Sequence, residues 1–137
     1  MRCHALIVSL LATSAAAEDI TLIPPDGLEW KTTADGVAFA ALDGDRFAEA
    51  YHAMVRLPAG VVSPPHIKTG AMFGVMLQGR MRHYPAGADP AAAPEIGPGG
   101  YYKISGGLAH VSACVSAEPC VTYLYQDRAF DFLPVSE

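Results

Sequence analysis

Short apolar segments separated by turns rich in glycine and proline follow one another along most of the chain. Residues 51–57 alternate most clearly, with Tyr51, Ala53, Val55 and Leu57 on one face and a more polar opposite face. This pattern is typical of a strand with one buried side. Further strand-like runs occupy residues 21–23, 36–42, 61–66, 72–77, 79–84, 101–104, 110–115, 121–125 and 130–133.

The turns between these runs indicate how the strands are connected. Asp43-Gly44-Asp45 predicts a hairpin that joins 36–42 to 51–57, and we expect a last hairpin between 110–115 and 121–125. Residues 85–98, rich in proline and alanine, predict a surface loop. Because no convincing amphipathic helix interrupts the strands, the sequence predicts an all-β sandwich or barrel.

Composition supports one folded domain and argues against two classes of partner. The chain has 137 residues, of which 51% are hydrophobic and 17% are charged, enough for a single domain with a real core. Its formal net charge is −5 and it has no cluster of lysine and arginine. We therefore expect neither nucleic-acid binding nor attraction to an anionic membrane surface.

The first residues predict export. Met1-Arg2 is followed by the apolar run 5–12 and by the small residues 15–17, which fit a signal peptide with its cleavage site. We interpret residues 1–17 as a signal peptide and residues 18–137 as the mature domain. The apolar run is too short to span a bilayer, so we expect a periplasmic or secreted product with no membrane segment after cleavage.

Two cysteines remain in that mature domain. Cys114 and Cys120 lie six residues apart, on either side of the expected last hairpin turn. In an oxidising compartment an even pair favours a disulfide over a metal site. Opposed positions of an antiparallel pair are close enough for such a bond, so we predict a Cys114–Cys120 disulfide.

Candidate chemistry gathers in two stretches. His66 directly follows the Pro64-Pro65 corner and precedes the apolar run 72–77, and His110 ends the stretch 99–110. A polar ring at the mouth of an apolar strand pair is typical of a ligand site. No Ser-His-Asp order, phosphate loop or carboxylate pair is present in the sequence.

These two stretches resemble the paired motifs of the cupin superfamily. In the first motif Gly60, His66 and Gly79 match, whereas Lys68 replaces the second histidine and Met72 replaces the glutamate. The second motif matches at its glycines and its histidine, and departs from the pattern at two positions; it reads Gly99, Ser105, Gly107, His110 and Cys114. The resemblance covers about residues 51–125 and implies a single-domain jelly-roll β-barrel, similar to the cupin domain of anti-sigma-factor sensors.

Three functions follow from this resemblance and its departures. The first is a small-molecule site inside the barrel, catalytic or not, in which His66, Lys68 and His110 bind a small carboxylate or sugar acid. The second is a metalloenzyme with a divalent transition metal on His66, His110 and a third donor such as His83, because two imidazoles alone do not make a tight site. The third is a structural or sensing module with a closed cavity. The resemblance and an exposed edge strand at 21–23 are compatible with a homodimer.

Overall fold

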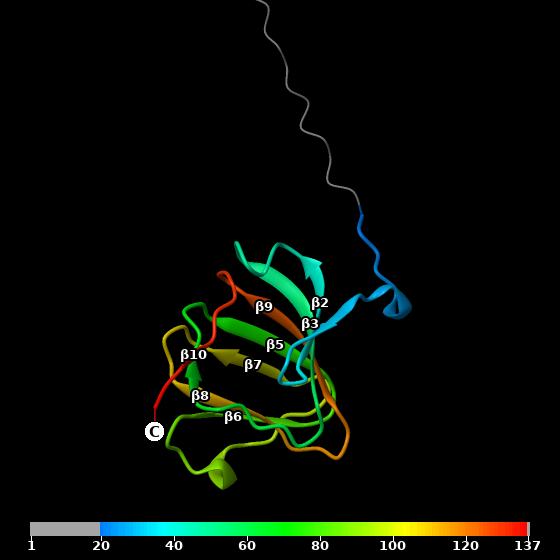
Figure 1. Cartoon of the computed structure of the whole chain (residues 1–137). Coiled ribbons are helices and arrows are strands. Elements are labelled where there is room, and N and C mark those ends of the chain that lie inside the picture. Colours follow the sequence, from blue (N-terminus) through cyan, green and yellow to red (C-terminus); the bar gives the residue numbers. More distant parts are fainter. Residues whose placement is uncertain (1–19, 137) are drawn as a thin grey trace, which may run out of the picture.

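The computed structural model describes residues 20–136, which form two β-sheets facing each other (Figure 1). The predicted signal peptide, residues 1–17, lies outside the described residues. The elements in chain order are the 3₁₀ helix η1 (Pro25–Gly27), the strands β1 (Trp30–Thr32), β2 (Ala38–Asp43), β3 (Tyr51–Leu57), β4 (His66–Ile67), β5 (Met72–Gln78) and β6 (Met81–Pro85), the 3₁₀ helix η2 (Pro90–Ala92), and the strands β7 (Tyr101–Ile104), β8 (His110–Cys114), β9 (Cys120–Gln126) and β10 (Leu133–Pro134).

One sheet has six strands in the order β1-β2-β3-β9-β5-β7, and the other has four in the order β10-β4-β8-β6. All pairings are antiparallel, and most neighbours in a sheet are distant in sequence. This arrangement confirms the expected all-β jelly roll. The two sheets remain separate, so the barrel is not closed by a continuous ladder of hydrogen bonds.

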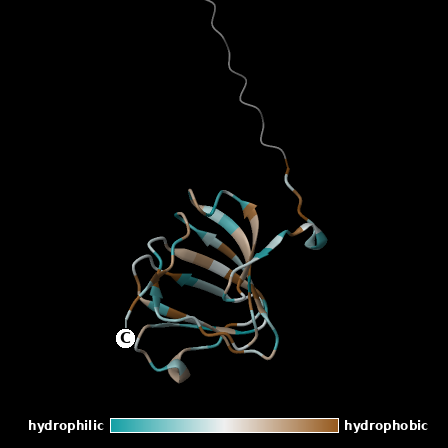
Figure 2. Ribbon diagram, in the orientation of Figure 1, coloured by the Kyte–Doolittle hydropathy of each residue, from teal (hydrophilic) through white to brown (hydrophobic). Residues whose placement is uncertain are grey.

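Alternation places the core between the sheets. In β3 the residues Tyr51, Ala53, Val55 and Leu57 are all buried, as their spacing predicts. They meet buried residues of β5, β8 and β9 in one hydrophobic cluster. Figure 2 shows apolar segments within strands of both sheets, which is the distribution that a sandwich with one internal face per sheet requires.

Four expectations about strands are wrong. The runs expected at 61–66 and 130–133 form only the two-residue strands β4, which begins at His66 after two prolines, and β10, which begins at Leu133. The edge strand expected at 21–23 does not form, and the edge position belongs to β1, which pairs with β2. The last hairpin does not form either, since β8 pairs with β4 and β6 whereas β9 pairs with β3 and β5. The chain crosses from one sheet to the other between Cys114 and Cys120, and both segments satisfy their backbone groups on other strands.

The predicted disulfide is present, but it joins the two sheets instead of two strands of one hairpin. Cys114 ends β8 and Cys120 begins β9, with their Cα atoms 5.8 Å apart and a bond between their sulfur atoms. Both residues are almost fully buried, with 1% and 0% of their surface exposed. The bond therefore holds the sheets together at one end of the core.

The long loop is attached to the four-stranded sheet by charge pairs. Glu95 accepts from Arg80 and Arg82, at 3.2 and 2.8 Å, and Ile96 exchanges backbone hydrogen bonds with Met81. Glu95 is therefore part of a small ion-pair network. In the described part of the chain, no helix has the length and apolar character needed to cross a membrane.

We expect that the double variant Cys114→Ala with Cys120→Ala is less stable by about 2 kcal/mol, because a short closed loop removes modest entropy from the unfolded chain. Urea unfolding of the variant against the oxidised protein measures the loss. The reduced parent protein is the control, and it should lose a similar amount. An unchanged free energy of unfolding would contradict a role for this bond in holding the sheets together.

Candidate functional site

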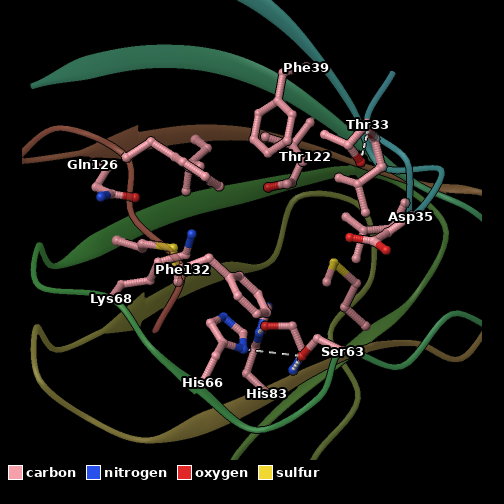
Figure 3. Close-up of a pocket in the computed structure, with 18 of the residues that line it drawn as sticks. Thr33, Asp35, Phe39, Ser63, His66, Lys68, His83, Thr122, Gln126 and Phe132 are labelled. Atoms are coloured by element: carbon pink, nitrogen blue, oxygen red, sulfur yellow. Dashed lines mark hydrogen bonds between the residues drawn. The ribbon is translucent and has the colours of Figure 1, made fainter. Parts of the chain in front are cut away.

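A cavity of about 360 Å³ lies between the two sheets, and most of its wall is apolar or aromatic. Figure 3 shows polar side chains entering it from several elements, with His66, His83 and Ser63 from one side and Lys68 and Gln126 from another. Of the predicted site residues, His66, Lys68 and His83 line the cavity. This volume and composition are typical of a pocket for a small organic molecule.

His66 begins β4, where the Pro64-Pro65 corner directs the chain into the four-stranded sheet. Its Nδ1 atom lies 2.9 Å from the carbonyl oxygen of Pro64, and only 3% of the residue is exposed. A carbonyl only accepts, so Nδ1 carries the proton and the neutral ring leaves a lone pair on Nε2. Burial lowers the pKa of His66 to about 4, outweighing the Pro64 carbonyl that raises it.

His110 lies directly behind His66. The two residues are register partners of β8 and β4, and their ring centroids are 4.3 Å apart. His110 Nδ1 donates to the Leu108 carbonyl oxygen at 2.9 Å, while its buried Nε2 has no hydrogen-bond partner among the described residues. His110 does not line the cavity, so its contact with a ligand is indirect, through the position of the His66 ring.

Lys68 follows β4 and is directed inward, with only 6% of its surface exposed. Its ammonium donates a hydrogen bond to the carbonyl oxygen of Asp131 and lies 3.6 Å from the centroid of the Phe130 ring. Burial lowers the pKa of Lys68 to about 8, and the nearby Asp131 carboxylate opposes this shift. The lysine is thus an internal cation held by neutral groups, and not a solvated residue at a strand end.

Residues 130–135, which we call the C-terminal strap, form one wall of the cavity. Phe132 stacks on the His66 ring with centroids 4.1 Å apart, and β10 pairs with β4. The Asp131 carboxylate accepts from the backbone nitrogen of Thr69 at 3.1 Å and from its hydroxyl. Sequence reasoning placed a strand at 130–133 and missed this role, because no local pattern shows which distant segment the strap contacts.

His83 enters the cavity from β6, on the same side as Met81, as its alternation predicts. Its Nδ1 lies 2.9 Å from the Ser112 hydroxyl, and its ring lies against Tyr102 with centroids 4.3 Å apart. Its Nε2 is buried without a partner among the described residues. Burial lowers the pKa of His83 to about 4, with smaller contributions from the other two histidines.

Gly74 explains how Tyr102 reaches the cavity. Residues 72–75 of β5 pair with β7, and Gly74 lies directly opposite Tyr102. A Cβ atom at Gly74 would overlap the phenol ring of Tyr102. The absence of a side chain at Gly74 therefore lets this ring lie across the strand, where its hydroxyl is 3.2 Å from the hydroxyl of Thr122.

The described residues do not fit the four-ligand metal site that the motif resemblance implies. His66 and His110 both present an Nε2 lone pair, which suits a metal ligand. The other two motif positions are occupied by an ammonium, which repels a cation, and by Met72, a soft and weak donor. Within residues 20–136, no group of three or more His, Cys, Asp or Glu side chains is arranged to hold a metal ion.

The fold and the paired motifs define the class of protein as a cupin. Among solved structures, the chain is similar to the polyketide cyclase RemF from Streptomyces resistomycificus, with 15% identity, a TM-score of 0.67 and coverage of 87% of each chain. It is also similar to KdgF from Halomonas sp., with 16% identity, a TM-score of 0.62 and coverage of 79% of this chain and 95% of that one. At such identities the likeness shows the fold alone.

The chain belongs to the ChrR cupin-like domain family, whose model matches residues 18–129. In the complex of Rhodobacter sphaeroides SigE with the anti-sigma ChrR, a chain with 22% identity and a TM-score of 0.60 is matched over 76% of this chain and 51% of that one. This protein thus spans about half the length of that chain. No curated protein matches it in sequence. The C-terminal strap lies beyond the residues that the family model matches.

We expect stability to fall as pH falls from about 6.5 to about 4. The unfolded chain protonates its histidines near 6.5, whereas burial holds the pKa values of His66 and His83 near 4, so the unfolded state binds more protons in this window. The stability is fully present above this window and falls by roughly 1–3 kcal/mol for each histidine across it.

Urea unfolding at several pH values measures this slope, and His83→Gln serves as the comparison. The variant should lose less stability than the parent over the same window, because a glutamine does not titrate. Parallel curves for the two proteins would show that His83 is protonated equally in the folded and unfolded states.

Proposed function

We propose that this protein is an exported cupin that binds a small organic carboxylate, such as a sugar acid, inside its barrel without a metal. The observation that carries the proposal is the Lys68 ammonium, which lines an apolar cavity and has no carboxylate within ion-pair distance among the described residues. A buried cation whose direct contacts are a carbonyl and aromatic rings is only partly compensated by the nearby Asp131 carboxylate, and an anionic ligand would complete its neutralisation.

The proposed site divides the work between two side chains. Lys68 supplies the charge, since an ammonium has three N–H donors and one of them is used by the Asp131 carbonyl. His66 supplies an acceptor through Nε2, which suits a hydroxyl group beside the carboxylate. His110 has a positioning role, because its ring supports His66 from behind.

Export rests on the predicted signal peptide and gains support from the disulfide. A buried Cys114–Cys120 bond suits an oxidising compartment, such as the periplasm or the cell exterior. The names of the similar proteins do not favour one function over another, since they include a cyclase and an anti-sigma complex. The sensing alternative with a cavity packed shut is disfavoured by an internal volume of about 360 Å³.

Binding of small acids to metal-stripped protein tests the proposal. We expect that a panel of hydroxy and sugar acids contains at least one that binds by calorimetry in the presence of a chelator. Lys68→Met should weaken that binding by about tenfold or more, since a charge-assisted hydrogen bond to a desolvated ion is lost. Lys103→Met, at an exposed position of β7, is the matched control and should leave the dissociation constant unchanged.

Two results would overturn this proposal. Binding that disappears with the chelator and returns with a transition metal would favour the metalloenzyme on His66, His110 and His83. Equal affinities for the parent and the Lys68→Met variant would show that the ammonium is not the anchor.

A second prediction concerns the two departures from the motif. The double variant Lys68→His with Met72→Glu supplies the missing nitrogen and oxygen donors beside His66 and His110. We expect it to retain about one divalent transition metal per chain in mass spectrometry, where the parent retains none, and to lose the metal-free binding of acids. Stoichiometric metal in the parent would contradict this prediction.

A further inference from the structure

Among the described residues that line the cavity, only Lys68 and Asp35 carry a formal charge at neutral pH. They come from distant parts of the chain and lie in different environments. Lys68 is buried beside the C-terminal strap, whereas Asp35 is exposed in the turn between β1 and β2. Figure 3 shows the two side chains at opposite sides of the cavity, with Asp35 beside Thr33 and Lys68 beside Phe132.

Neither charge takes part in a direct ion pair within the described part of the chain, although the Asp131 carboxylate lies near Lys68. The ion pairs there join Arg80 and Arg82 to Glu95, and none of these three residues lines the cavity. Lys68 donates to a neutral carbonyl, and the Asp35 carboxylate takes part in no side-chain hydrogen bond with a described residue. The cavity therefore presents a positive charge without a direct ion pair at its buried end and a negative charge without a direct ion pair at its exposed end.

Most of the cavity wall is apolar, although Ser63, His83 and Thr122 also line it. It includes Val37, Val55, Leu57 and Leu124, which cannot bond to a polar group. A ligand that fills the cavity therefore needs a largely apolar body, because most of the wall offers no partner to a polar group. The polar ends of such a ligand must match the two charges.

We propose that the ligand is an amphoteric molecule whose carboxylate binds Lys68 and whose ammonium, separated by an apolar body, binds Asp35. The inference rests on the proposed function and specifies its ligand class. An α-amino acid does not fit this ligand class, because its carboxylate and its ammonium are both bonded to the same carbon and cannot reach opposite sides of the cavity. The reverse orientation places an ammonium against Lys68 and is repelled.

The two ends contribute differently. Lys68 is buried, so its attraction to a carboxylate acts at a low effective dielectric and determines whether an acid binds at all. Asp35 is exposed, so its attraction is weakened by water and screened by salt. Asp35 thus discriminates between acids with and without a distal ammonium, and the effect is several-fold in affinity.

Matched probes test the inference. The purified protein is titrated at low salt with 6-aminohexanoate and hexanoate, and with 4-(aminomethyl)benzoate and 4-methylbenzoate. In at least one pair, we expect the probe that carries the ammonium to bind about three- to tenfold more tightly than the matching acid without it. Asp35→Asn should remove this difference. Asp26→Asn, at an exposed position of η1, is the control and should preserve the difference.

The outcomes separate this inference from the proposed function. If none of these four probes binds and no acid of the hydroxy- and sugar-acid panel binds either, the proposed function fails. If plain acids bind through Lys68 while the ammonium adds nothing, the amphoteric ligand class is overturned and the acid site stands. An equal loss of both probes in Asp35→Asn would also overturn it, because the residue would then act on the fold of the cavity mouth.

Discussion

Burial of the Lys68 ammonium between the two sheets is the constraint on which the site depends. A cation in an apolar interior requires compensation, and here the Asp131 carbonyl and the Phe130 ring supply it. Both groups belong to the C-terminal strap, so the strap and the lysine stabilise each other. The position of the strap in turn determines the wall of the cavity, since Phe132 stacks on His66.

The two ends of the sandwich are closed by different means, and the cavity follows from that difference. At one end the Cys114–Cys120 bond joins the sheets, and Met76 and Met81 fill the space beside it. Away from that end, Phe130 and Phe132 of the strap line the cavity without filling it. The interior is therefore packed beside the disulfide and hollow beside the strap, where Lys68 lies.

Local patterns predicted most of the fold and part of the site. Alternation in β3 identified its buried face, and motif spacing brought His66 and Lys68 to one site, because both signals depend on residues close in sequence. Sheet membership of β8 and β9 was not predictable in this way, since adjacent strands with a short connection equally suit a hairpin. The strap escaped prediction because its contact between Thr69 and Asp131 spans 62 residues.

The chain matches the first cupin motif better at its turn residues than at its ligand positions. Gly60 and Gly79, which begin and end the first motif, both have positive φ values of 73° and 72°. Such a conformation favours glycine whatever the site contains, so these residues report the path of the backbone. The positions between these glycines determine the chemistry of the site. There the ammonium of Lys68 and the thioether of Met72 replace an imidazole and a carboxylate. The same backbone therefore holds Lys68 at a position where the motif has a metal ligand. A site whose pattern suits a metal cation thus carries the positive charge of a side chain instead.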